Sequence, residues 1–491
     1  MTARIIAGAV ERDGAELDTR GARLAGGLRR LGLREGDVLA VLLRNDAAYA
    51  DVVLASRVGG TFYCPLNWHF TVEEAAFILR DSGARAILAE PAMLEPLRAA
   101  LPADIAVLSL GEEYESWLAA QPAYDGPPVQ PRAHMGYTSG TTGRPKGVRR
   151  LPVPPERQAA QRAAMAEVVS ATFGTEPGCR ALVSAPLYHS APSVFVQNAL
   201  AAGELLVVEP RFDAEQTLAL IERHRIEVVY LVPVMYVRLL RLPEEVRRRY
   251  DISSLRFVCS TGAPCAPEVK RAMIDWFGPI ITETYASTES GMITVATSAD
   301  ALARPGTAGR AVGGAELRIL DQADRPLPIG EIGRVFVQQP AYPDFTYHGR
   351  EEERRAIERD GCISLGDMGY LDAEGFLFLC DRASDMVISG GVNIYPAEIE
   401  HALLRLPGVL DCAVFGIPDA EFGERLHAIV QPALEAAPNS DDIAAGLRAL
   451  IAGYKVPRGI EITAELPRDP NGKIAKRKLR EPYWAGRERR I

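Results

Sequence analysis

Apolar residues recur with a helical period in some segments and as short continuous runs in others, and the two kinds alternate through the first two thirds of the chain. Residues 17–31 and 71–82 have helical spacing, whereas Val38–Leu43 and Ala86–Leu88 are short apolar runs. Further runs of strand length lie at 181–185, 204–208, 227–232, 255–259 and 279–284. Strands separated by helices indicate parallel strands with crossover helices, so we expect an α/β body.

The pattern changes twice toward the C-terminus. From Gly309 to about Cys380, short alternating runs are broken by Gly and Pro, which predicts antiparallel hairpins forming a small β-barrel-like part. After Asp381 the periodicity predicts an α+β segment, with helices at 396–405 and 441–452 and strands near 410–416, 426–432 and 459–464. The 110 residues of 382–491 are enough for one small domain, so we place a boundary after Asp381.

Charge and cysteine content narrow the functional class. The 491 residues carry 55 Lys and Arg against 64 Asp and Glu, a net charge of −9, which disfavours a nucleic-acid or anionic-membrane binder. The seven cysteines are dispersed and form no CxxC, so we expect free buried thiols. The N-terminus lacks a secretory signal and no apolar run is long enough for a transmembrane segment, which predicts a cytoplasmic protein. The basic tail predicts a solvated, mobile end after Arg480.

A loop rich in hydroxyls and glycines carries the clearest chemistry. The segment Tyr137–Gly147 reads YTSGTTGRPKG and follows a short strand-like stretch. Successive backbone N–H groups and hydroxyls of such a loop bind phosphate oxygens, with Lys146 as a point charge. It is not a Walker A loop, because Pro145 precedes the lysine and Gly147 follows it. The alternative is a flexible surface turn. The candidate phosphate ligands are Thr138, Ser139, Gly140, Thr141, Thr142, Gly143 and Lys146.

At this loop the sequence resembles the adenylate-forming superfamily of acyl-CoA synthetases, beetle luciferases and peptide-synthetase adenylation domains. It is most similar to bacterial fatty-acid-type acyl-CoA synthetases, and the resemblance covers nearly the whole chain. It implies an N-terminal adenylating domain at 1–381 with the ATP and acyl pockets, and a mobile C-terminal domain at 382–491. It also implies ATP, Mg²⁺ and CoA as cofactors and a small-molecule carboxylate as substrate, and leaves a homodimer open.

The segment YASTES resembles the family's Tyr-Gly-x-Thr-Glu motif. By that likeness Tyr285 packs on adenine, Thr288 meets the α-phosphate and Glu289 helps to hold Mg²⁺, a role that suits a carboxylate. Ala286 stands where the family usually has Gly, which matters only if the position needs a positive φ. The segment STGAPC resembles the adenine-contacting loop; its candidate residues are Gly262, Ala263 and Pro264.

Three later segments complete the resemblance. Asp367 and Arg382 match residues that contact the ribose hydroxyls. Lys473 matches the lysine that bridges the carboxylate and the α-phosphate, where a mobile ammonium stabilises the transition state. Gly390 and Gly391 match the lining of the thiol tunnel. Ser384 occupies the hinge position, where the family usually has Asp or Lys, so the resemblance does not supply a salt bridge there.

The acyl pocket is expected to be apolar. The segment APLYHSAP matches the substrate channel, with His189 as a gating or pocket residue; a packed core histidine is the alternative. Peptide-synthetase domains begin this region with an aspartate for the α-amino group, and here no acid is present. The run Tyr230–Tyr236 is also uncharged, so we expect an apolar monocarboxylate, whether fatty, aromatic or alicyclic.

Together these features predict an AMP-forming acid–thiol ligase that makes acyl-AMP and then acyl-CoA. A stand-alone adenylating enzyme that loads an acyl carrier protein is an alternative. A luciferase-like oxygenase is disfavoured, because the C-terminus RERRI lacks the peroxisomal Ser-Lys-Leu signal. A non-catalytic nucleotide-binding sensor would tolerate loss of Lys473 and Glu289, and both are present.

Overall fold

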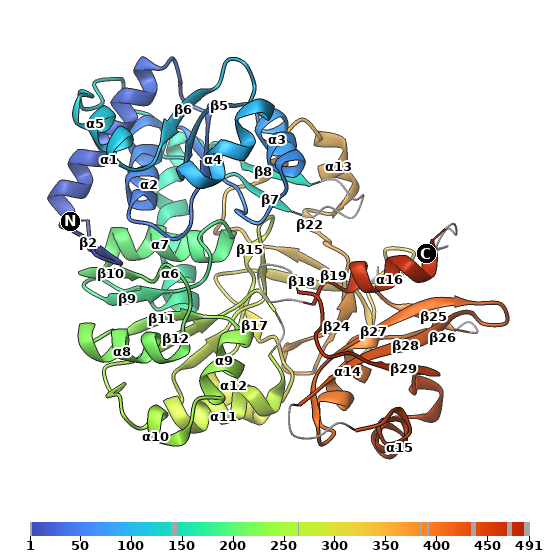
Figure 1. Ribbon diagram of the computed structural model, residues 1–491. Helices are drawn as coiled ribbons and strands as arrows, with labels where there is room; N and C mark the ends of the chain where they lie inside the picture. The colour runs from blue at the N-terminus through green and yellow to red at the C-terminus, as the bar shows by residue number, and fades with distance from the viewer. Residues whose placement is uncertain are drawn as a thin grey trace. The chain divides into compact units, whose positions relative to one another are not determined.

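The computed structural model describes residues 2–138, 145–263, 265–382, 385–389, 392–433, 438–468 and 474–485 (Figure 1). The chain divides into two compact units. The first unit comprises 1–316 and 337–361, and the second comprises 317–336 and 362–491. The boundary expected after Asp381 stays a prediction.

A mainly parallel sheet forms the centre of the first unit. Its strands are, in spatial order, β13 (Ile281–Glu283), β12 (Phe257–Ser260), β11 (Val228–Leu231), β9 (Arg180–Val183), β10 (Leu205–Val208), β1 (Arg4–Ala7) and β2 (Val10–Arg12). All neighbours pair in parallel except β1 and β2, which form an antiparallel hairpin. The α/β class expected from the sequence is confirmed. The strand β1 was not expected, because only Ile5 and Ala7 of its four residues are buried.

A second parallel sheet shows how the pattern of the sequence builds two cores. Its order is β4 (Phe62–Pro65), β3 (Val38–Leu42), β5 (Ala84–Ala89) and β6 (Ala106–Ser109). Successive side chains of a strand point to opposite faces of the sheet. Accordingly Leu39 and Val41 join the large core that includes the main sheet, whereas Val38 and Leu42 join a separate core beneath other helices. Because both faces are covered, β3 reads as a continuous apolar run.

Helices and small sheets complete the first unit. The helices are α1 (Gly14–Arg30), α2 (Ala48–Gly59), α3 (Val72–Asp81), α4 (Pro91–Leu97), α5 (Glu112–Ala119), α6 (Gln158–Phe173), α7 (Ser190–Ala202), α8 (Ala214–His224), α9 (Pro233–Leu240), α10 (Glu244–Arg247), α11 (Pro267–Phe277), α12 (Ser298–Ala303) and α13 (Glu351–Ala356). The short 3₁₀ turns are η1 (Arg98–Ala100) and η2 (Pro155–Arg157). The remaining strands are β7 (Gly136–Thr138), β8 (Lys146–Arg150), β14 (Ala286–Ser287), β15 (Gly291–Met292), β16 (Thr294–Val295), β17 (Arg310–Ala311), β20 (Phe345–Tyr347) and β21 (Glu358–Arg359).

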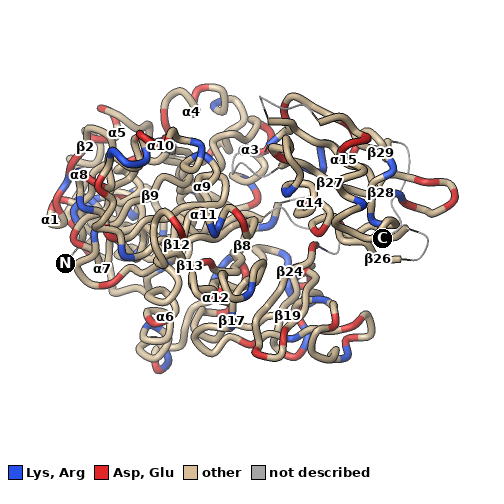
Figure 2. Tube along the Cα trace, turned by 90° about the horizontal axis from the view of Figure 1, so that it is seen from below, with Lys and Arg blue, Asp and Glu red and all other residues tan. Residues whose placement is uncertain are grey.

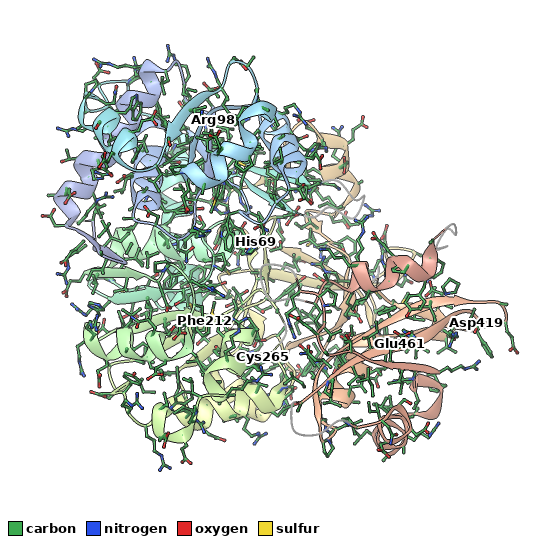
Figure 3. The ribbon with its side chains drawn as sticks, in the orientation of Figure 1. His69, Arg98, Phe212, Cys265, Asp419 and Glu461 are labelled. Atoms are coloured by element: carbon green, nitrogen blue, oxygen red, sulfur yellow. The ribbon has the colours of Figure 1, made fainter. Side chains whose placement is uncertain are left out.

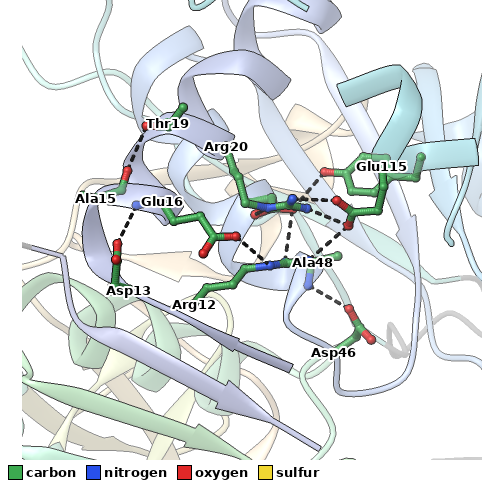
Figure 4. Close-up of polar contacts among 11 residues, drawn as sticks. Arg12, Asp13, Ala15, Glu16, Thr19, Arg20, Asp46, Ala48 and Glu115 are labelled. Carbon is green, nitrogen blue, oxygen red and sulfur yellow. Dashed lines mark hydrogen bonds and ion pairs between the residues drawn. The ribbon is translucent and has the colours of Figure 1, made fainter. Parts of the chain in front are cut away.

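A buried ion-pair cluster ties α1, α2 and α5 together (Figure 4). Asp51 on α2 is fully buried, and its two oxygens accept from Arg20 on α1 at 2.9 and 2.7 Å. The hydroxyl of Tyr114 donates to the same carboxylate at 3.1 Å, and Arg20 also reaches Glu115 at 2.7 Å. A buried carboxylate persists only when its oxygens are satisfied, and here both are.

The second unit is mainly antiparallel. Its strands and helices are β18 (Glu316–Leu320), β19 (Gly333–Gln338), β22 (Cys362–Ile363), β23 (Asp367–Leu371), β24 (Leu377–Arg382), β25 (Val387–Ser389), β26 (Val392–Ile394), α14 (Pro396–Leu404), β27 (Val409–Asp419), β28 (Gly423–Pro432), α15 (Ser440–Leu450), η3 (Gly453–Lys455), β29 (Gly459–Ile462) and α16 (Lys476–Trp484). Strands β27 and β28 form a long antiparallel hairpin, and β29 pairs with β28 in parallel. The hairpins expected before Cys380 are present, since β23 pairs antiparallel with both β19 and β24.

The expectation of a solvated, mobile end after Arg480 is wrong for Tyr483 and Trp484. Helix α16 continues to Trp484, whose indole Nε1 donates to the carbonyl oxygen of Gly416 at 3.0 Å. The hydroxyl of Tyr483 donates to Glu461, which Figure 3 labels, at 2.7 Å. Leu479 and Tyr483 stand four residues apart on one helix face and pack against the Phe415 core, an apolar stripe hidden among basic residues.

The described cysteines are free thiols, as expected, and only Cys380 among them is partly exposed. Basic and acidic positions are interspersed over the elements of both units (Figure 2). Within the described ranges, no helix combines the length and apolarity required to span a bilayer.

Candidate active site

The motif segments of the first unit meet at one edge of the main sheet. Strands β9, β11, β12 and β13 are parallel, so the segments that follow them emerge at the same, carboxyl, edge. His189 follows β9, the apolar segment Tyr230–Tyr236 begins in β11, and Gly262 follows β12. Tyr285 follows β13. The topology therefore gathers at this edge segments that extend from His189 to Tyr285 in the sequence.

The segment expected to bind phosphate begins and ends in two antiparallel strands. Thr138 ends β7, Lys146 begins β8, and the two residues are directly paired. Both residues belong to the described chain, whereas the five candidates between them lie outside the described residues: Ser139, Gly140, Thr141, Thr142 and Gly143. The short strand expected before this segment is β7, and the role of the segment in phosphate binding stays a prediction.

Two glycines allow this hairpin to pack closely. A Cβ at Gly136 would lie 2.7 Å from Ser190 Oγ and 3.0 Å from Thr288 Cγ2. A Cβ at Gly147 would lie 2.4 Å from Met135 Cε. The distances of 2.7 and 2.4 Å are shorter than real Cβ contacts, and 3.0 Å is tight, so the absence of a side chain at Gly136 lets Ser190 and the Thr288 turn approach the hairpin.

Thr288 and Glu289 lie in the tight turn between β14 and β15. The Ser287 hydroxyl accepts from the backbone N–H of Ser290 at 2.8 Å, which closes the turn. Ala286 pairs with Met292 in the short hairpin, and the described non-glycine residues with positive φ are Arg225, Asp324 and Asp360. Alanine in place of the family's glycine is therefore unstrained at position 286.

Glu289 receives two hydroxyl donors. Its Oε1 accepts from Thr138 Oγ1 and from the Tyr347 hydroxyl, each at 3.1 Å, and the residue is 6% exposed. Burial, with a smaller contribution from Glu289, raises the pKa of Tyr347, so the phenol keeps its proton. Mg²⁺ at a nucleotide takes one or two carboxylates and completes its shell with phosphates and water. One buried carboxylate at the end of a phosphate hairpin fits that demand, and the described residues contain no cluster of three or more metal-ligating side chains.

Thr288 is held on both its side chain and its backbone. Its hydroxyl lies 2.9 Å from the Ser190 hydroxyl at the start of α7. Its carbonyl oxygen accepts from Arg150 Nη2 at 2.8 Å, and Arg150 comes from β8. The Thr288 turn is therefore fixed by α7 on one side and by the phosphate hairpin on the other.

Lys146 is buried and paired with an acid. The residue is 6% exposed; its Nζ lies 2.5 Å from Glu353 Oε2 and 5.1 Å from the centre of the Tyr347 ring. Tyr347 thus touches both Lys146 and Glu289, the two charged candidates of the first unit.

The adenine candidates occupy adjacent loops. Gly262 has a φ of +93° and is exposed, and Ala263 is partly exposed. The Thr261 hydroxyl donates to the carbonyl oxygen of Thr284 at 2.8 Å and so joins this loop to the one that carries Tyr285. Cys265, labelled in Figure 3, follows the loop directly and is buried.

His189 caps α7 through its backbone and belongs to an aromatic group. Its ring centre lies 4.2 Å from that of Tyr188, and Trp68 meets Tyr188 edge-on at 6.3 Å. The residue is partly exposed, and its role as a gating or pocket residue, against a packed core histidine, stays a prediction. Tyr230, in β11, is buried against two further aromatic rings. Its ring centre lies 5.7 Å from that of Phe195 and 6.4 Å from that of Phe173.

The two ribose candidates face each other in the second unit. Asp367 and Arg382 are paired across β23 and β24, and Arg382 Nε lies 3.5 Å from Asp367 Oδ1. Their side chains are 15% and 60% exposed. Pro264, Ser384, Gly390, Gly391 and Lys473 lie outside the described residues.

Four contact residues were not expected from the sequence. Arg150, Ser190, Tyr347 and Glu353 each touch a candidate that was expected. Ser190 directly follows His189 in the channel segment, so its position in the sequence could have identified it as a site residue. The other three belong to no motif and reach the site only through the sheet β20–β8–β7 and helix α13.

Comparison with protein families identifies the chain. The model described as AMP-binding enzyme matches residues 6–342, and the AMP-binding enzyme C-terminal domain matches 398–473. The chain belongs to the AMP-binding enzyme family. The adenylate-forming resemblance noted at the Tyr137–Gly147 segment is confirmed.

Three relatives of the AMP-binding enzyme are informative. A feruloyl-CoA synthase of Amycolatopsis sp is 34% identical over 96% of this chain and 93% of that protein. The fatty acid–[acyl-carrier-protein] ligase ScoC of Streptomyces coeruleorubidus is 32% identical over 97% and 92%. The crystal structure of ATP-bound MatB from Rhodopseudomonas palustris matches with a TM-score of 0.86 and 29% identity, covering 98% of this chain and 96% of that one.

Proposed function

We propose that this AMP-binding enzyme is an ATP-dependent carboxylate–CoA ligase acting on an apolar monocarboxylate. The observation that carries the proposal is the hydrogen bond from Thr138 to Glu289. It brings the end of the phosphate hairpin to the turn of Thr288 and Glu289, so groups suited to phosphate oxygens and to Mg²⁺ converge. The relation to a feruloyl-CoA synthase supports the choice of an acid–thiol ligase.

In the first half-reaction, a carboxylate oxygen attacks the α-phosphorus of ATP and the bond to the β-phosphate oxygen breaks, giving acyl-AMP and pyrophosphate. Thr288 donates to the α-phosphate, while Thr138 and Lys146 hold the phosphates. Glu289 would hold Mg²⁺, which supplies neutralisation of phosphate charge. Lys473 is assigned by family likeness to the charge between carboxylate and α-phosphate.

In the second half-reaction, the CoA thiol loses its proton and attacks the acyl carbonyl, and AMP leaves as the thioester forms. Asp367 and Arg382 are assigned to the ribose hydroxyls, and their pairing across one ladder gives a carboxylate acceptor beside a guanidinium donor. Gly390 and Gly391 are assigned to the thiol path by family likeness alone.

An apolar acid suits the lining of the channel segment. Tyr188 and His189 follow β9 beside Trp68, and the apolar run after β11 contains Met235 and Tyr236, both buried. Pockets of this composition bind apolar tails and leave one polar end for chemistry. Two of the relatives act, by name, on a ferulate and on fatty acids, which are both monocarboxylates.

The test is a pyrophosphate-release screen of the full chain with MgATP across ferulate, other aryl acids, alicyclic acids and fatty acids. We expect release with at least one of these acids and none with α-amino acids or dicarboxylates. Fast release with an α-amino acid, or none with any monocarboxylate, would contradict the proposal.

A second candidate acceptor is an acyl carrier protein, and the likeness to ScoC favours it. The two acceptors are compared by adding each of them to enzyme that has formed acyl-AMP from the best acid, and by measuring how fast acyl-AMP is consumed. Free CoA should consume acyl-AMP at least as fast as a phosphopantetheinylated carrier protein does. Rapid transfer to the carrier with no transfer to CoA would assign the second candidate.

A further inference from the structure

The buried cation of the phosphate hairpin already has an anionic partner. Lys146 Nζ lies 2.5 Å from Glu353 Oε2, and the side chains are 7% and 37% exposed. Glu353 lies in the acidic first turn of α13, next to the exposed Glu352. It belongs to no motif and has no role in the mechanism above.

Glu353 is part of a chain of polar contacts beneath both strands of the hairpin. Arg350 Nε lies 3.8 Å from Glu353 Oε1, and the Arg350 guanidinium pairs with both oxygens of Asp81, at 2.5 and 3.2 Å. Asp81 Oδ2 also accepts from the Tyr137 hydroxyl at 2.8 Å. Tyr137 is on β7 and Lys146 on β8, so the network braces each strand that leads into the phosphate loop.

We propose that Glu353 is an internal anion that occupies the Lys146 ammonium until a triphosphate takes its place, and that it thereby sets the affinity for MgATP. This inference rests on the proposed function, in which Lys146 holds phosphate oxygens.

Burial makes the exchange asymmetric. An ammonium with little access to water is costly to leave without an anion, so Lys146 needs a partner in the absence of nucleotide. Glu353 is far more exposed, and Arg350 offers it a second cation. Its carboxylate is therefore released to solvent at low cost when phosphate oxygens arrive, whereas Asp81 keeps its bidentate arginine throughout.

The proposal fixes the sign of a mutational effect. If Glu353 competes with phosphate for Lys146, removal of its charge tightens MgATP binding. If Glu353 instead held Lys146 in the orientation that phosphate needs, the same change would weaken binding. AMP lacks the β- and γ-phosphates, so its affinity should change less than that of ATP.

The experiment measures the Kd of MgATP and of AMP by calorimetry, on the full chain without any carboxylate. The variants are Glu353→Gln, its neighbour Glu352→Gln as a charge-matched control, Lys146→Met, and the double variant Glu353→Gln with Lys146→Met. We expect Glu353→Gln to lower the Kd of MgATP about three- to fivefold, and Glu352→Gln to leave it within about twofold. Lys146→Met should raise it about tenfold, and the double variant should match Lys146→Met.

Weaker or unchanged MgATP binding in Glu353→Gln would overturn the proposal. So would a gain that persists in the double variant, because the effect would then not pass through Lys146. If Glu352→Gln tightened MgATP binding equally, the effect would come from the total negative charge of the first turn of α13, and this result would also overturn the proposal. A wild-type protein that binds MgATP but activates no acid would overturn the proposed function and leave this comparison of affinities intact.

Discussion

At the residue scale, Gly136 lies against the turn to which we assign Thr288 and Glu289. A Cβ there would lie 2.7 Å from Ser190 Oγ and 3.0 Å from Thr288 Cγ2. We therefore expect Gly136→Ala to displace Thr288, to destabilise the fold by about 1–3 kcal/mol and to lower the rate of pyrophosphate release at least tenfold. Urea denaturation and the release assay measure the two effects. Gly453→Ala is the control, because nothing lies within 4 Å of its Cβ; similar losses in both variants would contradict the assignment.

The buried side chain of His134 should make the stability of the fold depend on pH. Burial, with a smaller contribution from the Arg150 guanidinium, lowers the pKa of His134 from 6.5 to about 4. The unfolded chain therefore binds a proton on this histidine between those values while the folded chain does not, so stability falls as the pH decreases through that window. We expect His134→Gln to lose less stability than wild type between about pH 7 and about pH 5 in urea denaturation. An unchanged loss would show that His134 titrates normally.

Candidate residues that belong to a sequence motif could be predicted, whereas residues that only contact those candidates in the folded chain could not. Thr138, Lys146 and Glu289 were found because a dense pattern of unusual residue types surrounds each of them. Glu353 contacts Lys146 across about two hundred positions of sequence, and glutamates are common on exposed helix turns. Only the folded sheet reveals that this glutamate is different from its neighbours.

At the scale of elements, α16 is held to α14 by one partly buried pair. Lys476 Nζ lies 2.8 Å from Glu400 Oε1, which also accepts from the backbone N–H of Val414 at 2.7 Å. Lys476→Met would leave that carboxylate without its cation, so we expect a loss of about 1–3 kcal/mol in the free energy of unfolding and faster hydrogen exchange in α16.

Lys455→Met is the matched control for that prediction. Lys455 pairs with Glu398 at 2.6 Å, but Glu398 is 46% exposed. Screening by water limits such pairs to less than about 1 kcal/mol, so the control should leave α16 exchange unchanged. Equal effects of the two lysine variants would mean that the Lys476 pair does not anchor the helix.

Some helices and strands could be predicted from the sequence pattern, and others could not. The alternation of helices and strands was sufficient to predict the α/β body, because both faces of β3 and its neighbours are buried. Strand β1 was missed because it buries only Ile5 and Ala7, whereas the equally short strands β9–β12 bury three or four of their residues. Helix α16 was missed because Leu479 and Tyr483 are a sparse apolar stripe within a run of charges.

At the scale of the whole molecule, the family likeness assigns Lys473 to adenylation only. We expect Lys473→Ala to slow acyl-AMP formation about 10²–10³-fold, roughly 3–4 kcal/mol, because one preorganised charge is lost. Conversion of synthetic acyl-AMP to thioester by CoA should stay within a few-fold of wild type. Single-turnover kinetics of each half-reaction make the comparison, and an equal collapse of both would assign Lys473 to both steps or to structure.

The strand order of the main sheet has a consequence for how such a ligase diversifies. On the proposed assignment, β9 and β11 are neighbours that serve the acid, and β12 and β13 are neighbours that serve the nucleotide. The acid-serving strands, with the helices that follow them, lie in the contiguous stretch 180–240, while the nucleotide-serving ones lie in 257–289. One uninterrupted stretch of gene therefore encodes the strands assigned to the acid, so substitutions confined to it should alter the choice of acid and leave ATP binding unchanged, except at Ser190, whose hydroxyl contacts Thr288.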